Sequence, residues 1–247
     1  MKNENVPAGD FHARVIAVLQ NVGTVEREYI SSLSEGECNA VGTYQDWAPK
    51  DRLAHITYWH RRIVENLSYL SRSQSLPEYP ELEECNHQNF EENRDKPAQA
   101  IIREAEAVMR AIPLALRPFS EEDLRSPGKF PGEGQTTLLS YLLGGFYIHP
   151  VFHLCEGYLK LGMVDEVDRL ADQMVADILS LDDSPRMRGT ILYDRACFYA
   201  VSGKLDQALQ TLEQSLNLRP DLKEWASQDS DLNNLHADPA FLALVRS

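Results

Sequence analysis

Two histidines four residues apart, His149 and His153, are the side chains in this sequence best suited to chemistry. Residues at i and i+4 lie on one face of an α-helix, so the two imidazoles could bind one metal ion. Glu156 follows on the same face, where it could orient an imidazole or act as a catalytic base. The alternative is that both histidines are partly buried beside carboxylates or backbone groups, and that Glu156 is a solvated surface residue.

Two more histidines lie in the segment that follows Trp47. At ~100° per residue, His60 falls near the middle of an apolar stripe, whereas His55 falls well off its centre. The stripe consists of Leu53, Ile56, Ile63 and Leu67. A histidine in the middle of a stripe is typical of a core, so we expect His60 to pack inward and consider it only a substitute ligand.

Three further residues are candidates for binding a substrate. Trp59 could form a wall of the site, although it could equally be a core aromatic residue. Asn86 and His87 lie on a long polar connection, from which they could reach the mouth of a pocket or simply cap the loop. The sequence contains no Ser-His-Asp order, phosphate-binding glycine loop or dinucleotide fingerprint.

Composition excludes several classes of partner. The formal net charge of −14 opposes approach to nucleic acid and to anionic lipid headgroups. The polar opening MKNENVPAGD has no feature of a secretory signal, and the most apolar stretch, 138–148, is shorter than the ~20 residues that span a bilayer. The four cysteines are widely spread, which fits reduced, structural thiols in a cytoplasm. We therefore expect a cytoplasmic protein with no membrane segment.

The elements that position these residues are predicted to be helices, because apolar residues recur at helical spacing and no convincing strand pattern is present. We expect helices at about 10–33, 49–70, 97–112 and 136–161, with Pro49 and Asp51 in a first turn and Gly162 just past the last end. The long connection 71–97 contains three prolines and cannot be one continuous helix. Pro150, together with Gly144 and Gly145, predicts a kink or break beside His149. The fold class is all-α, with an up-and-down four-helix bundle over residues 1–162.

Beyond Gly162 the chain repeats itself with an offset of 41 residues, which aligns Gly203 with Gly162 and Tyr199 with Tyr158. Gly at a hairpin between two helices lets such pairs stack, so residues 163–247 are predicted to form helical hairpins with a C-terminal cap. The stretch ACFYAVSGKLDQALQTLEQSLNLRP resembles a tetratricopeptide repeat, with Ala196, Tyr199 and Gly203 in the matching positions. The resemblance implies a possible protein partner for this segment, or a purely structural cap.

The N-terminal part resembles the DinB-like superfamily of four-helix bundles, and within it the ClbS/DfsB-type branch. The resemblance rests on WAPKDRLAHITYWH from Trp47, CNHQNFEEN from Cys85, SPGKFP from Ser126 and YIHPVFH from Tyr147. It implies a three-histidine metal site made of His55, His149 and His153. Neutral imidazoles suit zinc or nickel better than magnesium or calcium.

The same resemblance implies action on a small reactive molecule, as a metal-dependent hydrolase or a thiol-dependent transferase. Two other functions remain open. The chain could be a non-catalytic interaction protein that binds a protein partner through the tetratricopeptide segment, or a binder that sequesters a small molecule without turnover. The sequence does not identify the substrate, the metal, a thiol cofactor or the oligomeric state.

Overall fold

The computed structural model describes residues 10–128 and 136–246, and these residues form helices without a β-strand. The predicted all-α fold class is therefore confirmed. The chain divides into two compact units, Met1–Gly157 and Tyr158–Ser247. The division falls inside the last of the four predicted long helices, five residues before the expected boundary at Gly162.

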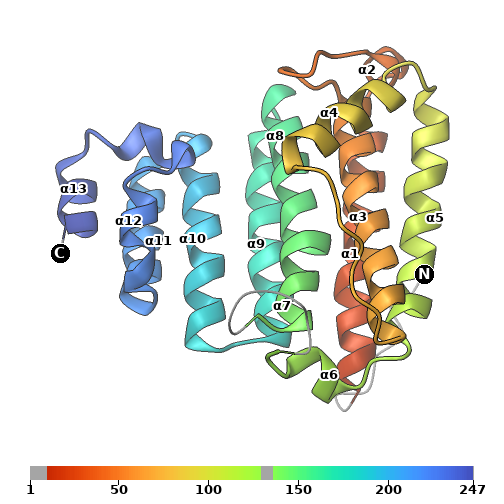
Figure 1. Ribbon diagram of the computed structural model, residues 1–247. Helices are drawn as coiled ribbons and strands as arrows, with labels where there is room; N and C mark the ends of the chain where they lie inside the picture. Colours follow the sequence, from red (N-terminus) through yellow and green to blue (C-terminus); the bar gives the residue numbers. More distant parts are fainter. Residues whose placement is uncertain (1–9, 129–135, 247) are drawn as a thin grey trace. The chain divides into compact units, whose positions relative to one another are not determined.

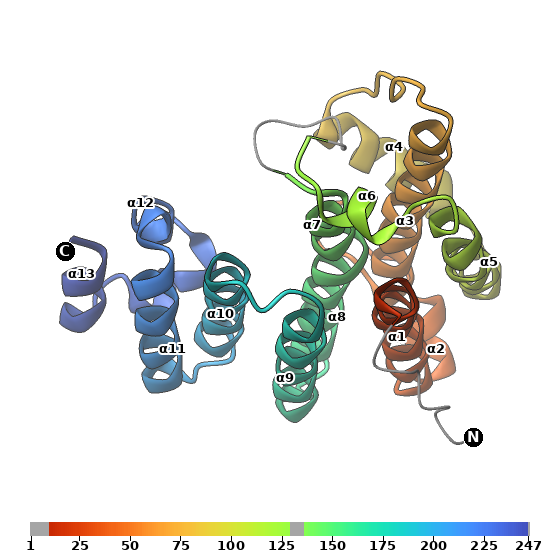
Figure 2. The same cartoon turned by 90° about the horizontal axis from the view of Figure 1, so that it is seen from below.

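Four long helices form the first unit (Figures 1 and 2). They are α1 (Phe11–Ser31), α3 (Pro49–Ser71), α5 (Ala98–Leu116) and a composite helix of α7 (Leu138–Leu142), η1 (Leu143–Ile148) and α8 (His149–Lys160), whose last three residues belong to the second unit. Each long helix presents an apolar face to its neighbours, and the core between them includes Leu19, Ile56, Leu67, Ile112 and Phe146. These four helices match the four predicted segments.

The start of α3 follows the chemistry expected from the sequence. Pro49 occupies the first turn, and the Asp51 carboxylate accepts hydrogen bonds from the backbone N–H groups of Gly42 and Ala48, at 2.8 and 3.0 Å. A β-carbon on Gly42 would lie 2.5 Å from backbone atoms, so the loop before α3 can fold this tightly only with glycine there. This loop positions Trp47 directly before the helix.

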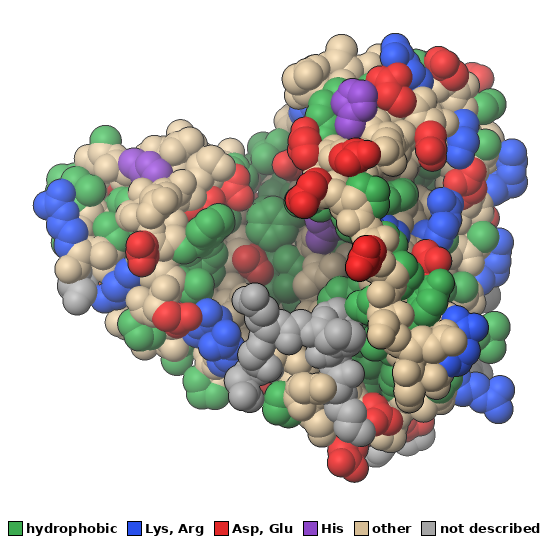
Figure 3. Space-filling view, in the orientation of Figure 1, with side chains coloured by type: hydrophobic (Ala, Val, Ile, Leu, Met, Phe, Trp, Pro, Cys, Tyr) green, Lys and Arg blue, Asp and Glu red, His purple; other side chains and the backbone are tan. Residues whose placement is uncertain are grey.

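Three short helices connect the long ones: α2 (Glu35–Asn39), α4 (Leu82–Asn93) and α6 (Glu121–Arg125). The connection before α5 is indeed not one continuous helix, but most of its second half is α4, which the acidic composition and the prolines concealed. Cys85, Asn89 and Phe90 of α4 are buried, whereas its acidic residues are exposed and visible over α4 in Figure 3. Part of the SPGKFP loop, residues 129–131, lies outside the described residues.

The composite helix is continuous through Pro150, so the predicted break does not occur. Instead the segment Leu143–Ile148 is a π-helix, in which the backbone N–H of His149 donates to the carbonyl of Gly144, five residues earlier. The helix therefore accommodates Pro150, Gly144 and Gly145 through a wider turn and does not break.

The stretch Leu138–Lys160 is the one helix among the described residues that is long and apolar enough to cross a membrane. This helix is longer than 138–148, the most apolar stretch of the sequence, because the helix continues past Ile148. More than half of its most apolar window is buried inside the protein, as expected for the core helix of a soluble bundle. The finding is thus compatible with a soluble protein.

The second unit contains α9 (Val164–Leu181), α10 (Pro185–Val201), α11 (Leu205–Leu218), η2 (Pro220–Leu222), α12 (Lys223–Ala226), η3 (Ser230–Leu235) and α13 (Pro239–Arg246). Gly162 and Gly203, which the 41-residue offset aligns, both have positive φ, +72° and +77°, as expected for glycine at the end of a helix. Helices α10 and α11 lie close together: the Ser215 hydroxyl of α11 donates to the carbonyl of Gly189 at 2.7 Å, and a β-carbon on Gly189 would lie 3.0 Å from Cβ of Leu218. The helical hairpin around Gly203 is therefore present, while the assignment to tetratricopeptide repeats stays a prediction.

Candidate metal centre

Three imidazole rings converge in the first unit. The Nε2 atom of His149 lies 3.1 Å from Nε2 of His55 and 3.1 Å from Nε2 of His153, and the three potential ligand atoms all lie within 4.8 Å of one another. His55 comes from α3, and the other two come from the first half of α8. The structure thus brings together the three histidines that the sequence suggested as ligands.

The donor set fits a divalent ion. Bonds of ~2.1 Å at tetrahedral angles separate ligand nitrogens by roughly 3.4 Å, close to the separations found here. Burial, reinforced by the neighbouring histidines, lowers the pKa of His55 to about 2, and burial beside His153 lowers the pKa of His149 to about 3. Both rings are therefore neutral at neutral pH and can present lone pairs to a metal. The Nδ1 atom of His55 is buried without a hydrogen-bond partner among the described residues, so the ring is oriented by packing.

A carboxylate positions the third histidine. One oxygen of Glu156 lies 3.0 Å from Nδ1 of His153 and accepts a 2.8 Å hydrogen bond from the guanidinium of Arg52. Arg52 is almost fully buried, with 3% of its side chain exposed, whereas Glu156 is 56% exposed. This contact leaves Nε2 of His153 directed at the other two histidines. The arrangement matches the orienting role considered for Glu156; a role as catalytic base stays a prediction.

A cavity of about 460 Å³ adjoins the three histidines. Its described lining consists of Trp47, His55, Trp59, Ile63, Leu82, Asn86, Tyr141, Gly145, His149 and His153. In Figure 3 a histidine side chain is visible in a hollow beside the surface of α4. The cavity gives a small molecule access to the imidazole nitrogens.

Two tryptophans flank His55 in this cavity. The ring of Trp47 lies 4.5 Å from that of His55, and the ring of Trp59 lies 6.2 Å from it, both measured between centroids. The indole N–H of Trp59 donates to Oδ1 of Asn86 at 3.1 Å, which ties α4 to α3. Trp59 and Asn86 therefore both line the cavity, while their contact with a substrate stays a prediction.

The structure does not bring His87 into this cavity. His87 is exposed on α4 and packs edge-on against Tyr44, with ring centroids 5.1 Å apart. Asn86, which precedes it on α4, lines the cavity, whereas His87 is not among the described lining residues. Its expected contact with a substrate has no support from this position.

His60 packs into the core, as expected from its place on the apolar stripe. Its ring stacks on Phe146 at 3.9 Å, and its Nε2–H donates to the carbonyl of Phe146 at 3.1 Å. Nδ1 of His60 faces the buried Glu26 at 3.8 Å. Burial raises the pKa of Glu26 to about 8 and lowers that of His60 to about 3, so both groups are neutral at pH 7.

Several lining residues were not found from the sequence. Trp47 was noted only as a landmark before a helix, although an aromatic residue in the loop before a ligand-bearing helix was an available signal. For Leu82 and Tyr141 the sequence gave no signal of a lining position, because their placement depends on the unrecognised helix α4 and on the π-helical turn. Arg52 precedes His55 by three residues and so lies on the same helical face, which could have suggested a supporting role.

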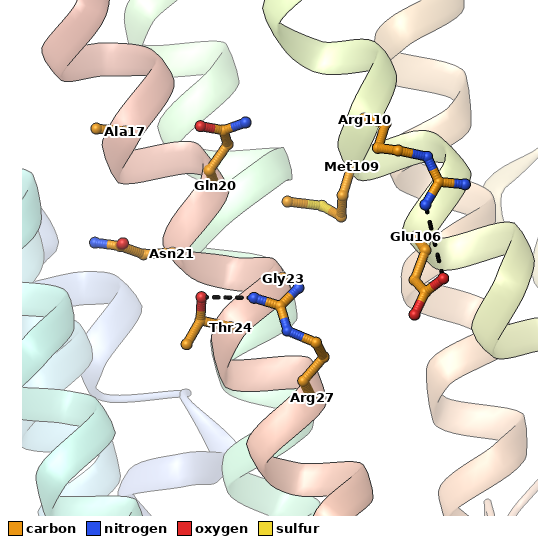
Figure 4. A pocket seen from close by; sticks show the side chains of 9 residues that line it. All are labelled: Ala17, Gln20, Asn21, Gly23, Thr24, Arg27, Glu106, Met109 and Arg110. Carbon is orange, nitrogen blue, oxygen red and sulfur yellow. Dashed lines mark hydrogen bonds and ion pairs between the residues drawn. The ribbon is translucent and has the colours of Figure 1, made fainter. Parts of the chain in front are cut away.

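A larger cavity, of about 600 Å³, lies between α1 and α5 and is unrelated to the histidines. Figure 4 shows its lining, in which Arg27 contacts Thr24, and Arg110 pairs with Glu106 across one turn of α5. Both arginines are thus engaged within their own helices. None of the residues predicted to carry chemistry lines this groove.

Comparison with protein families finds the DinB superfamily. Its model matches residues 19–153, which is more than half of the chain and includes all three histidines. Searches of curated proteins and of solved structures gave no match. The four packed helices, the histidine triad and the family match lead to one conclusion: the chain belongs to the DinB superfamily.

Proposed function

We propose that the protein binds a divalent metal ion, zinc or nickel, through His55, His149 and His153, and acts on a small reactive molecule in the adjoining cavity. The observation that carries the proposal is the convergence of three imidazole ligand atoms, one from each histidine, within 4.8 Å of one another. Proteins of the DinB superfamily typically bind metal, which agrees with this donor set. Three imidazoles are also the protein ligands of a familiar class of catalytic zinc site, which leaves a coordination position for water or substrate.

The chemistry expected is hydrolysis, or transfer of a thiol, in the manner considered for the ClbS/DfsB-type branch. A bound divalent ion would act as a Lewis acid there and lower the pKa of a bound water or thiol. Trp47 and Trp59 would confine the substrate beside His55. Glu156, held by Arg52, would keep His153 in place. We place this activity in the cytoplasm, in keeping with four cysteines that form no disulfide among the described residues.

Metal analysis of purified protein tests the proposal. We expect close to one zinc or nickel per wild-type chain and a loss of most of it in His153→Ala. His87→Ala is the matched control, because it removes an exposed histidine that lies outside the cavity and should leave the metal content unchanged. Equal metal content in wild type and His153→Ala, with both proteins folded by circular dichroism, would refute the site.

The second candidate is an interaction protein that uses its C-terminal unit to bind a protein partner. It is favoured by large exposed hydrophobic side chains in that unit, namely Val201, Leu205, Leu218 and Trp225. A co-purification from native cells that is lost on Trp225→Glu, while metal content stays near zero in wild type, would favour this function over the first.

A further inference from the structure

We propose that Tyr29 is a positioning residue for the metal centre. Its hydroxyl holds the guanidinium of Arg52, and Arg52 in turn holds the carboxylate that orients His153. This inference rests on the proposed function, since it concerns the same three-histidine site. Tyr29 lies on α1, a helix that supplies none of the three histidines, so the site depends on a third helix besides α3 and α8.

Arg52 is a buried cation with two partners. Its side chain is 3% exposed, and it donates to the carboxylate of Glu156 at 2.8 Å and to the hydroxyl of Tyr29. Its Nε atom has no hydrogen-bond partner among the described residues, so both contacts use the terminal nitrogens of the guanidinium. Burial raises the pKa of Tyr29 despite the nearby cation, so the hydroxyl is uncharged at neutral pH. Tyr29 therefore acts as a hydrogen-bond acceptor, while Glu156 supplies the opposite charge.

The carboxylate of Glu156 is not confined by burial. Its side chain is 56% exposed, and an ion pair at so exposed a group contributes little by itself, because water screens it. Its Oε2 atom lies 3.0 Å from Nδ1 of His153, and the same oxygen accepts from the buried Arg52. A displaced guanidinium would draw this oxygen away or release it. The ring of His153 would then lose the contact that orients it.

Gly157 determines where the ring of Tyr29 can lie. A β-carbon on Gly157 would lie 2.5 Å from the hydroxyl oxygen of Tyr29, and 2.7 and 2.9 Å from Cζ and Cε2 of its ring. Side chains do not approach a β-carbon so closely, so only glycine admits the ring at this position. Tyr29 is also 1% exposed, so close packing surrounds the rest of the ring. The hydroxyl is therefore confined beside both Arg52 and the backbone of α8.

These contacts form a closed ring across three helices. Tyr29 of α1 contacts Arg52 of α3, which contacts Glu156 of α8. The next residue of α8, Gly157, lies against Tyr29 again. In a closed ring of contacts, a shift of any one group disturbs two contacts, whereas the end of an open chain can move freely. A tyrosine that only filled the core would not need its hydroxyl at the cation that holds Glu156.

A double-mutant cycle on zinc affinity, measured by chelator competition, tests the inference. Tyr29→Phe keeps the buried ring and removes only the hydroxyl. We expect it to weaken zinc binding about three- to tenfold, less than the loss of a direct partner of a ligand. In a Glu156→Ala background the same change should alter zinc affinity by less than about twofold, because no carboxylate remains for Arg52 to hold. No effect in the wild-type background, or an equal loss in both backgrounds, would overturn the inference.

Two further variants check that the effect passes through Arg52. Tyr193→Phe is the matched control, since Tyr193 is also buried and its hydroxyl donates to Asp229 at 2.8 Å, but in the second unit. It should leave zinc affinity unchanged. Arg52→Lys keeps the cation but lacks the planar fork that serves two acceptors, so it should weaken zinc binding at least as much as Tyr29→Phe. Equal losses in the two phenylalanine variants, or full affinity in Arg52→Lys, would contradict the assignment.

A measurement without metal separates this inference from the proposed function. In metal-free protein with ¹⁵N-labelled histidine, NMR at mildly alkaline pH reports which ring nitrogen of His153 carries the proton. We expect Nδ1–H to predominate in wild type, because Nδ1 faces Glu156 at 3.0 Å, and a mixture with Nε2–H in Tyr29→Phe. A wild-type protein that binds no zinc would refute the proposed function, and the tautomer would still decide the inference. The same tautomer in both proteins would overturn it.

Discussion

The contact of Glu156 with both His153 and Arg52 is the residue-scale feature that orients one ring of the proposed metal site. Without the carboxylate, Arg52 would remain as a buried cation without its partner, and the ring of His153 could turn. A partner of this kind commonly contributes about 10- to 100-fold to metal affinity.

We expect Glu156→Ala to weaken zinc binding by about 10-fold or more, with a smaller loss in Glu156→Gln, which can still accept a hydrogen bond. A chelator competition assay measures both. Glu91→Ala is the control, since Glu91 is an exposed carboxylate paired with Arg94 on α4. Unchanged zinc affinity in Glu156→Ala would mean that packing alone orients His153.

A second residue-scale prediction concerns the buried acid Glu26. Its pKa is raised from 4.5 to about 8, so between these values the folded state holds a proton that the unfolded state has released. Stability contributed by this group is complete below about pH 4.5 and is lost as pH rises toward 8.

Glu26→Gln removes this titration while it preserves the shape of the side chain. The free energy of unfolding of Glu26→Gln, measured by chemical denaturation, should rise relative to that of wild type by about 1 kcal/mol or more as the pH is raised from 5 to 8. Glu106→Gln, at a half-buried acid paired with Arg110 on α5, is the control for the loss of one carboxylate. A constant difference between Glu26→Gln and wild type across this range would argue against a neutral Glu26.

At the scale of elements, the π-helical turn η1 positions His149 and places Gly145 against α3. A methyl group at Gly145 would approach Cδ1 of Ile63 to 2.8 Å, a distance that requires the neighbour to move.

We therefore expect Gly145→Ala to lower the melting temperature, because overpacking in a core costs about 1–3 kcal/mol. Combining it with Ile63→Val, which lacks the Cδ1 atom, should restore most of the loss, so that the two changes are not additive. Thermal unfolding of the two single variants and the double variant provides the cycle. An additive loss would show that the contact with Ile63 is not the cause.

The four long helices were predictable because each has an apolar stripe and a clear beginning, such as Pro49 and Asp51 in α3. Helix α4 was not, since its sequence is acidic, lies between prolines and buries only one side. The pair His149 and His153 could be suggested because i and i+4 spacing survives any change in the turn before His149, whereas the choice of His55 over His60 came from the resemblance to the DinB-like superfamily. The cavity could not be predicted from the sequence, because Leu82, Tyr141 and Gly145 come together only through the tertiary arrangement of three elements.

At the scale of the whole molecule, a net charge of −14 should govern encounters with polyanions. We expect no retardation of a DNA duplex in a gel-shift assay at ~10 µM protein and low salt, where electrostatic attraction is strongest. A retarded band that disappears as salt is raised would contradict this expectation and would point to a local basic surface.

The π-helical turn has one more consequence, which concerns the length of the gene product. A π turn contains one residue more than the α turn that it replaces, so Leu143–Ile148 reads as an α-helical segment with a single-residue insertion. An α-helix turns ~100° per residue and a π-helix ~80°, so six π-helical residues turn through nearly the same angle as five α-helical ones. Removing one residue from η1 so that the turn closes as an α-helix would therefore leave His149 and His153 directed at His55. A deletion between His149 and His153 would instead turn His153 by ~100° relative to His149 and separate the pair.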